Sequence, residues 1–161
     1  TSGITVTDTI SSSIEAIIES PSDVAIDPSG VIMAIANTSQ NNVVVYNKSA
    51  DGINWVYEAT ITTGVGSHPQ GVAIDNSFNI FVSATDAEQV RVFSYDILEE
   101  EWDINSAIAF ETLEEDSIPS RIEILDSNDK LVIIDQRENE QRAIYFTYEV
   151  QSPQNSEEEE Q

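Results

Sequence analysis

The sequence repeats itself at a spacing that few folds can accommodate. Residues 21–32 read Pro-Ser-Asp-Val-Ala-Ile-Asp-Pro-Ser-Gly-Val-Ile, and residues 69–80 read Pro-Gln-Gly-Val-Ala-Ile-Asp-Asn-Ser-Phe-Asn-Ile. They align without a gap at 69 − 21 = 48 residues, and a more diverged copy begins at Pro119, 119 − 69 = 50 residues further on. A period of about 20–50 residues indicates a chain built from stacked copies of one supersecondary unit.

Each copy is predicted to contain short β-strands separated by turn residues. The first strand of each copy runs into a segment of Pro, Ser, Gly, Asn or Asp, residues that suit tight bends. The first strand of each copy is expected at 24–27, 72–75 and 122–125, and the second at 32–36, 80–84 and 131–135. The third strand is expected at 43–46, 90–93 and 143–146, and the fourth at 55–61 and about 104–110. The fold class is therefore all-β, with three four-stranded antiparallel units.

The N-terminal segment Ile14–Ile18 is predicted to be one more strand of the fourth kind. Ile14-Glu-Ala-Ile-Ile precedes Pro21 much as Tyr57-Glu-Ala-Thr-Ile precedes Pro69. The apolar residues of the chain are dominated by Ile and Val, which favour strands over helices. We expect an extension at 1–13, one domain at 14–150 with repeats at about 21–68, 69–118 and 119–150, and an acidic disordered tail at 151–161.

The repeat resembles the NHL and lactonase-like family of β-propellers, chiefly in His68-Pro-Gln-Gly-Val-Ala-Ile-Asp75 followed by Ile80-Phe-Val-Ser-Ala84. The resemblance implies that each copy is one blade, so that the chain is half of a propeller. Three blades cannot close a ring, and we expect a head-to-tail dimer with six blades. In that dimer Ile14–Ile18 of one chain would pair beside Ala143–Phe146 of the other, which would cover an exposed strand edge.

The charge restricts the partners of the chain. Thirty acidic residues against six basic ones give a net charge of −24, which disfavours nucleic acid and anionic membrane surfaces. No apolar run is long enough for membrane insertion. The absence of cysteine gives no information on the redox compartment. The first residue, Thr1, is compatible with a removed signal peptide, so we expect an extracellular or cell-surface location.

Ligands of propellers usually lie at the axial face, where the loops entering the first strand and those joining the second and third strands meet. The residues predicted to bind a ligand there are Asp23, Asn37, His68, Asp86, Arg121, Asp135 and Arg137. Asp23, Asn37, Asp86 and Asp135 offer the oxygen ligands that Ca²⁺ prefers, and the resemblance implies an axial metal of this kind. His68, the single histidine, could be a general base or metal ligand, or a loop side chain bonded to the backbone.

Two other pairs recur with the repeat. Asp27 and Asp75 are predicted to cap the turns that follow them. Trp55 and Trp102 begin the fourth strands and are expected to cover the neighbouring sheet, with carbohydrate stacking as the alternative.

The sequence contains no Gly-x-Ser-x-Gly, phosphate-binding glycine loop or His-Glu-x-x-His motif. It favours a non-enzymatic binding or assembly scaffold, with a protein or carbohydrate ligand at the axial face. A Ca²⁺-dependent lactonase-like hydrolase and a structural subunit of an extracellular array are the alternatives.

Overall fold

The structure, a computed structural model, describes residues 9–11, 13, 15–96, 101–109, 116–125, 130–137 and 140–148. Their secondary structure consists of strands and two 3-10 turns, η1 (Thr38–Gln40) and η2 (Thr85–Ala87). The strands are β1 (Pro21–Ile26), β2 (Ile32–Asn37), β3 (Asn42–Lys48), β4 (Trp55–Thr62), β5 (Pro69–Ile74), β6 (Ile80–Ala84), β7 (Gln89–Asp96), β8 (Glu101–Ala109), β9 (Pro119–Ile124), β10 (Lys130–Gln136) and β11 (Gln141–Thr147). The all-β prediction is confirmed. Within this part of the chain, no helix is long and apolar enough to span a membrane.

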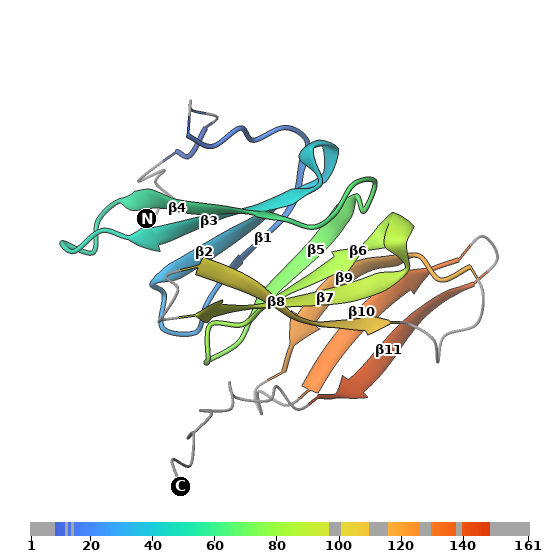
Figure 1. The fold of residues 1–161 in the computed structure, drawn as a ribbon. Helices are drawn as coiled ribbons and strands as arrows, with labels where there is room; N and C mark the ends of the chain where they lie inside the picture. Colours follow the sequence, from blue (N-terminus) through green and yellow to red (C-terminus); the bar gives the residue numbers. More distant parts are fainter. Residues whose placement is uncertain are drawn as a thin grey trace, which may run out of the picture.

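The strands form three antiparallel sheets in which sheet order follows chain order. The first blade is β1-β2-β3-β4, the second is β5-β6-β7-β8, and the third comprises β9-β10-β11 in the described residues. β5 lies against both β1 and β9, so these three are the inner strands, and the blades fan out from them (Figure 1). The predicted strand positions agree with this arrangement.

The hairpins of the first two blades turn around a buried aspartate. Asp27 accepts hydrogen bonds from three backbone N–H groups of the turn that follows it, at 2.7, 2.8 and 2.5 Å. Asp75 accepts two such bonds, both at 2.8 Å. Each aspartate is 3% exposed, and the predicted turn-capping role is confirmed. Burial raises the pKa of Asp27, but the bonds from Ser29 and the backbone outweigh it, and the pKa lies below its usual value.

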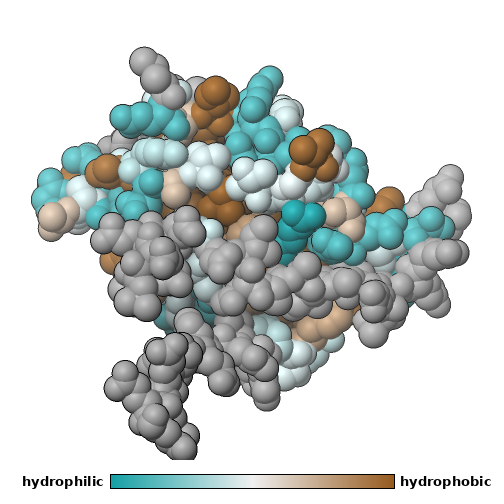
Figure 2. Space-filling model, in the orientation of Figure 1, coloured by the Kyte–Doolittle hydropathy of each residue, from teal (hydrophilic) through white to brown (hydrophobic). Residues whose placement is uncertain are grey.

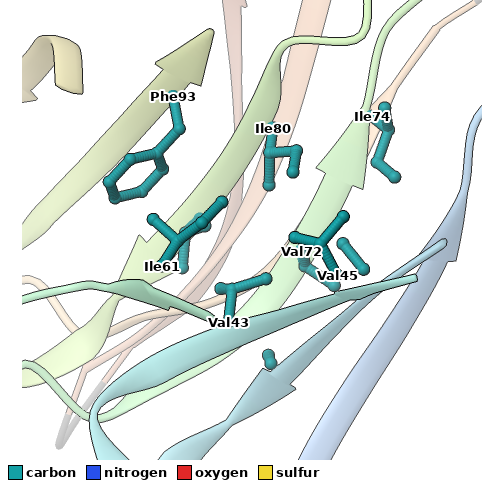
Figure 3. Packing of buried hydrophobic residues seen from close by; sticks show 10 residues of the cluster. Val43, Val45, Ile61, Val72, Ile74, Ile80 and Phe93 are labelled. Atoms are coloured by element: carbon teal, nitrogen blue, oxygen red, sulfur yellow. The ribbon is translucent and has the colours of Figure 1, made fainter. Parts of the chain in front are cut away.

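Apolar side chains fill the space between neighbouring blades, because the alternating faces of each sheet pack on the sheets beside it. Figure 3 shows the core between the first and second blades, where Val43 and Ile61 face Val72, Ile80 and Phe93. A second core, which includes Phe81, Leu131 and Ile133, joins the second blade to the third.

Hydroxyl groups also join the blades near the axis. The Thr38 hydroxyl donates to the carbonyl oxygen of Pro69 at 2.7 Å, and the Thr85 hydroxyl donates to that of Pro119 at 2.6 Å. Each threonine begins a 3-10 turn in one blade and bonds the first residue of the next inner strand. The same bond therefore recurs at both blade interfaces.

The N-terminal segment was predicted to be a strand, and in its described residues the structure shows none. Residues 15–19 have no strand pairing; Ala16 is buried on the first blade against the cluster of Met33, Val44 and Tyr46. Ala16 and Ile18 of this segment pack on a sheet face without a partner strand, whereas Ile17 is 59% exposed. The predicted tail at 151–161 and most of the extension at 1–13 lie outside the described residues.

Candidate functional site

A groove of about 310 Å³ lies along the three inner strands. Val24 and Ile26 of β1 and Ile74 of β5 contribute apolar surface to it. Asp23 and Glu123 add carboxylates from β1 and β9, the inner strands on either side of β5. Val24 and Ile26 are 56% and 52% exposed. The surface that lines the groove is mainly polar, and carboxylates stand on both of its flanks.

Asp23 is the predicted ligand-binding residue that the structure places in this groove. Its Oδ2 accepts the backbone N–H of Val72 at 3.1 Å, and its Oδ1 accepts that of Val24 at 3.0 Å. The carboxylate therefore links β1 to β5 while it lines the groove. Glu123 was not predicted as a site residue, although it stands where the other copies have Ala25 and Ala73, and this departure from the repeat is the signal that could have identified it.

The side chains of His68 and Asp86 contact each other where the loop into β5 meets the turn η2. His68 Nδ1 contacts Asp86 Oδ2, and the two side chains are 45% and 56% exposed. The His68 backbone has a φ of 44° and donates its N–H to Asn41 Oδ1 at 3.0 Å. The Asp86 N–H donates to the Ser67 carbonyl at 3.2 Å. These backbone bonds fix both partners in place.

The loop that carries His68 is tied to the second blade by an arginine. Arg91 of β7 donates from Nη1 to the Thr63 carbonyl oxygen, and its guanidinium lies against Gly64, whose φ is 93°. The Thr63 and Ser67 hydroxyls, both buried, hydrogen-bond each other at 2.7 Å. These polar groups hold the loop in place, while the side chains of Val65, His68 and Asp86 remain accessible to solvent.

Asn37, a predicted calcium ligand, has a structural role. Its side chain is buried at the end of β2, where Oδ1 accepts the N–H of Glu19 at 2.7 Å. Its Nδ2 donates to the Ile17 carbonyl at 2.7 Å and to Asn42 Oδ1 at 2.9 Å. The amide therefore anchors the segment that enters β1.

Asp135 occupies the corresponding position in the third blade, since it pairs with Pro119 as Asn37 pairs with Pro21. It is fully buried, and its carboxylate accepts the N–H of Ile118 at 2.7 Å. Arg137 and Arg142 reach the same carboxylate through Nε, at 3.2 and 3.0 Å.

These contacts determine the protonation of Asp135. Burial raises the pKa of Asp135, but the Ile118 N–H, Arg142, Ser117 and Arg137 together outweigh it and hold the pKa below its usual value. Arg137, a predicted ligand-binding residue, is thus part of a buried ion network, and Arg142 is a member that sequence reasoning missed.

Each of the four predicted calcium ligands bonds another group of the chain. Asp23 bonds β5, Asn37 bonds the N-terminal segment, Asp86 bonds His68, and Asp135 bonds two arginines. In the described residues, no three His, Cys, Asp or Glu side chains are grouped closely enough to hold a metal ion. Arg121 is exposed on β9, opposite Ile134. Of the predicted site residues, His68 thus contacts Asp86 and Arg137 contacts Asp135, and their binding of a ligand stays a prediction.

No protein-family model matches the sequence, and neither does any curated protein. Solved structures do resemble it. The periplasmic gluconolactonase PpgL of Pseudomonas aeruginosa superposes with a TM-score of 0.61 at 13% identity, over 79% of this chain and 36% of that one. A candidate 6-phosphogluconolactonase of Bacteroides uniformis gives 0.62 at 13% identity, over 84% and 38%.

The WD40 repeats of RRP9 give a TM-score of 0.51 at 16% identity, over 78% of this chain and 36% of that one. At such identities the likeness concerns the fold alone, and the chain spans little more than a third of each of these structures. The narrower resemblance to NHL repeats remains a prediction. The comparisons and the sheet topology agree that the chain has a β-propeller-type fold, with three consecutive blades.

Proposed function

We propose that this chain is a binding scaffold whose axial groove takes a positively charged, partly apolar segment, such as a stretch of basic peptide. The observation that carries the proposal is that Asp23 and Glu123 stand on the two strands that flank β5, beside the exposed apolar side chains of Val24 and Ile26. Carboxylates on both sides attract an ammonium or guanidinium group, and the valine and isoleucine contact the aliphatic stem behind it.

The charge of the whole chain supports the same ligand class. A net charge of −24 attracts cations over long distances and repels phosphorylated or carboxylated ligands. The remaining polar side chains of the loop end, Asn37 and Asp135 above all, are already hydrogen-bonded within the scaffold. The groove offers the exposed carboxylate of Glu123 together with that of Asp23, whose oxygens also accept two backbone N–H groups.

The test is a calorimetric titration with a short peptide in which lysine and leucine alternate. The double variant Asp23→Asn with Glu123→Gln should weaken binding by about tenfold or more, since two ion pairs are lost at the site. The matched control is Asp51→Asn with Glu58→Gln, which removes the same charge at two exposed positions outside the groove. Equal weakening in both variants would show that only overall charge attracts the peptide, and the groove would then be excluded.

A Ca²⁺-dependent hydrolase of lactones is the second candidate, favoured by the fold likeness to chains named as lactonases. The test measures hydrolysis of a lactone panel and the melting temperature with added Ca²⁺ or a chelator. Turnover that disappears with the chelator would support this candidate, and unchanged melting together with no turnover would exclude it.

A further inference from the structure

The groove along the inner strands is mainly polar, although most of the side chains that line it are apolar. Eight of its ten lining residues are Val, Ala, Ile or Pro, and the exceptions are Asp23 and Glu123. The eight have no polar atoms in their side chains. The polar surface that the two carboxylates do not supply therefore comes from main-chain N–H and C=O groups.

The hydrogen bonds of β1 show which of its main-chain groups are free to point toward the groove. The Asp27 N–H donates to the Ile32 carbonyl oxygen at 3.0 Å, so these two residues are a bonded pair of the antiparallel ladder. Bonded pairs alternate with pairs that are not bonded to each other, and the next residue of β1 that bonds β2 is therefore Ala25. The N–H and C=O groups of Val24 and Ile26 consequently point away from β2.

β5 and β9 repeat this pattern. The Asp75 N–H donates to the Asn79 carbonyl oxygen at 3.1 Å, and the Leu125 N–H donates to that of Lys130 at 3.0 Å. By the same alternation, the main-chain groups that point away from β6 and β10 belong to Val72, Ile74, Ile122 and Ile124. Among the described strands, each inner strand has a single neighbour in its sheet. Three strand edges without a partner strand therefore run along the groove.

A contact between blades shows where the edge of β5 points. The Val72 N–H donates to Asp23 Oδ2 at 3.1 Å, so this edge faces the groove that Asp23 lines. The N–H of Ile74, two residues further along β5, lies on the same edge, and Ile74 is 5% exposed. A main-chain group in so buried a residue needs a hydrogen-bond partner, and the groove is where that partner can enter.

The two carboxylates of the groove are staggered along the strand direction. By the repeat, Glu123 corresponds to Ala25, which stands two residues after Asp23 in β1. Two residues of strand extend over about 7 Å, and this is also the spacing of alternate side chains in an extended peptide. An extended peptide with a basic residue at every second position therefore matches the stagger of Asp23 and Glu123.

The surface of the chain favours polar recognition over apolar contact. On the face shown in Figure 2, the described residues carry brown apolar side chains in separate spots among teal polar ones. Binding through apolar contact alone is typical of a contiguous apolar patch. Main-chain hydrogen bonds together with charge therefore fit this surface better.

We propose that the ligand of the groove is an extended peptide that adds a strand to the free edge of β5 and pairs alternate basic side chains with Asp23 and Glu123. Peptides are recognised at exposed sheet edges in this way, through main-chain hydrogen bonds. The inference rests on the function proposed above and narrows its ligand class. A polyamine carries positive charge on apolar stems but has no peptide groups, so it cannot bond the strand edge.

The first test is a calorimetric titration with the short peptide of alternating lysine and leucine in three forms. One form is unmodified, one is N-methylated at each lysine, and one is N-methylated at each leucine. In an extended strand, the N–H groups of alternate residues point to the same edge, so only one methylated form loses the donors that meet β5. One form should bind about tenfold or more weakly than the unmodified peptide, and the other should lose much less. Spermine, the control without peptide groups, should also bind about tenfold or more weakly.

The second test locates the contact by hydrogen exchange measured with NMR. The Ile74 N–H, on the free edge of β5, should exchange about tenfold or more slowly when the unmodified peptide is bound. The Ala73 N–H, which points toward β6 in the same strand, is the matched control and should exchange slowly with or without peptide.

The outcomes separate this inference from the function proposed for the groove. Equal affinities of the two methylated forms, spermine binding as tightly as the peptide, or unchanged exchange at Ile74 in the complex would overturn strand addition. Each of these results would leave the binding of basic ligands in place. Absence of binding by the unmodified peptide would overturn both.

Discussion

Gly71 on β5 lies so close to Ser120 on β9 that a Cβ atom at position 71 would be 2.5 Å from the Ser120 carbonyl oxygen. The contact is with backbone, which cannot rotate away. Gly71→Ala should therefore destabilise the chain by about 1–3 kcal/mol through overpacking at the junction of the second and third blades.

The control for this substitution is Gly52→Ala. Gly52 has a φ of 71° and no atom within 4 Å of the added methyl group. The substitution should therefore destabilise the fold through backbone strain alone, by about 1–2 kcal/mol. Urea unfolding of both variants compares the two effects. A Gly71→Ala midpoint equal to that of the wild type would show that β5 and β9 separate easily.

Asp135→Asn should lower the free energy of unfolding by about 2–3 kcal/mol, because it leaves Arg137 and Arg142 without their shared anion. Asparagine keeps an oxygen for the Ile118 N–H, so the loss reports the charge rather than the backbone bond. Glu58→Gln, on the exposed side of β4, is the matched control and should change stability by less than about 0.5 kcal/mol. Similar melting temperatures for the two variants would contradict the role assigned to Asp135.

Acid should weaken the chain through Asp27 and Asp135. The pKa of each is depressed in the folded state, so each contributes stability above its unfolded pKa, about 3.9, and that contribution is lost as the pH falls through the folded pKa. As the pH is lowered from neutral to about 3, the urea midpoint of unfolding should therefore fall more steeply in the wild type than in the double variant Asp27→Asn with Asp135→Asn. Parallel curves would assign acid sensitivity to other carboxylates.

The hydrogen bonds that Thr38 and Thr85 make between blades should contribute equally and independently to stability. Thr38→Val and Thr85→Val each remove one hydroxyl donor from a proline carbonyl, at a cost of about 1 kcal/mol. The bonds lie at different interfaces, so the double variant should lose the sum within about 0.5 kcal/mol. Thr60→Val, whose hydroxyl bonds Tyr57 on the exposed surface of β4, is the control and should cost less. A large deviation from additivity would indicate that the two interfaces are coupled.

The sequence predicts the blades well because their determinants are local. The mainly apolar runs in residues 32–36 and 80–84 and the capping aspartates Asp27 and Asp75 act within one hairpin, and the structure agrees at each.

The roles of Asn37 and Asp135 depend instead on the path of the chain before the inner strand, which is set by how blades pack. Their partners, Glu19 and Ile118, are 18 and 17 residues away in the chain. A polar residue at the end of the second strand is therefore visible in the sequence, but its partners are not. The same holds for Ile14–Ile18, whose apolar residues fit either a strand or a segment lying on a sheet face.

The chain-ordered sheets have a consequence for biosynthesis. Within each sheet, a strand pairs with the one made just before it, so closing a hairpin requires only a short loop and little loss of chain entropy. The first blade can therefore form at the ribosome while the second is still being made. The Thr38 hydroxyl then remains without its Pro69 partner until the chain has grown past residue 69, so synthesis itself sets the order in which the interfaces are joined.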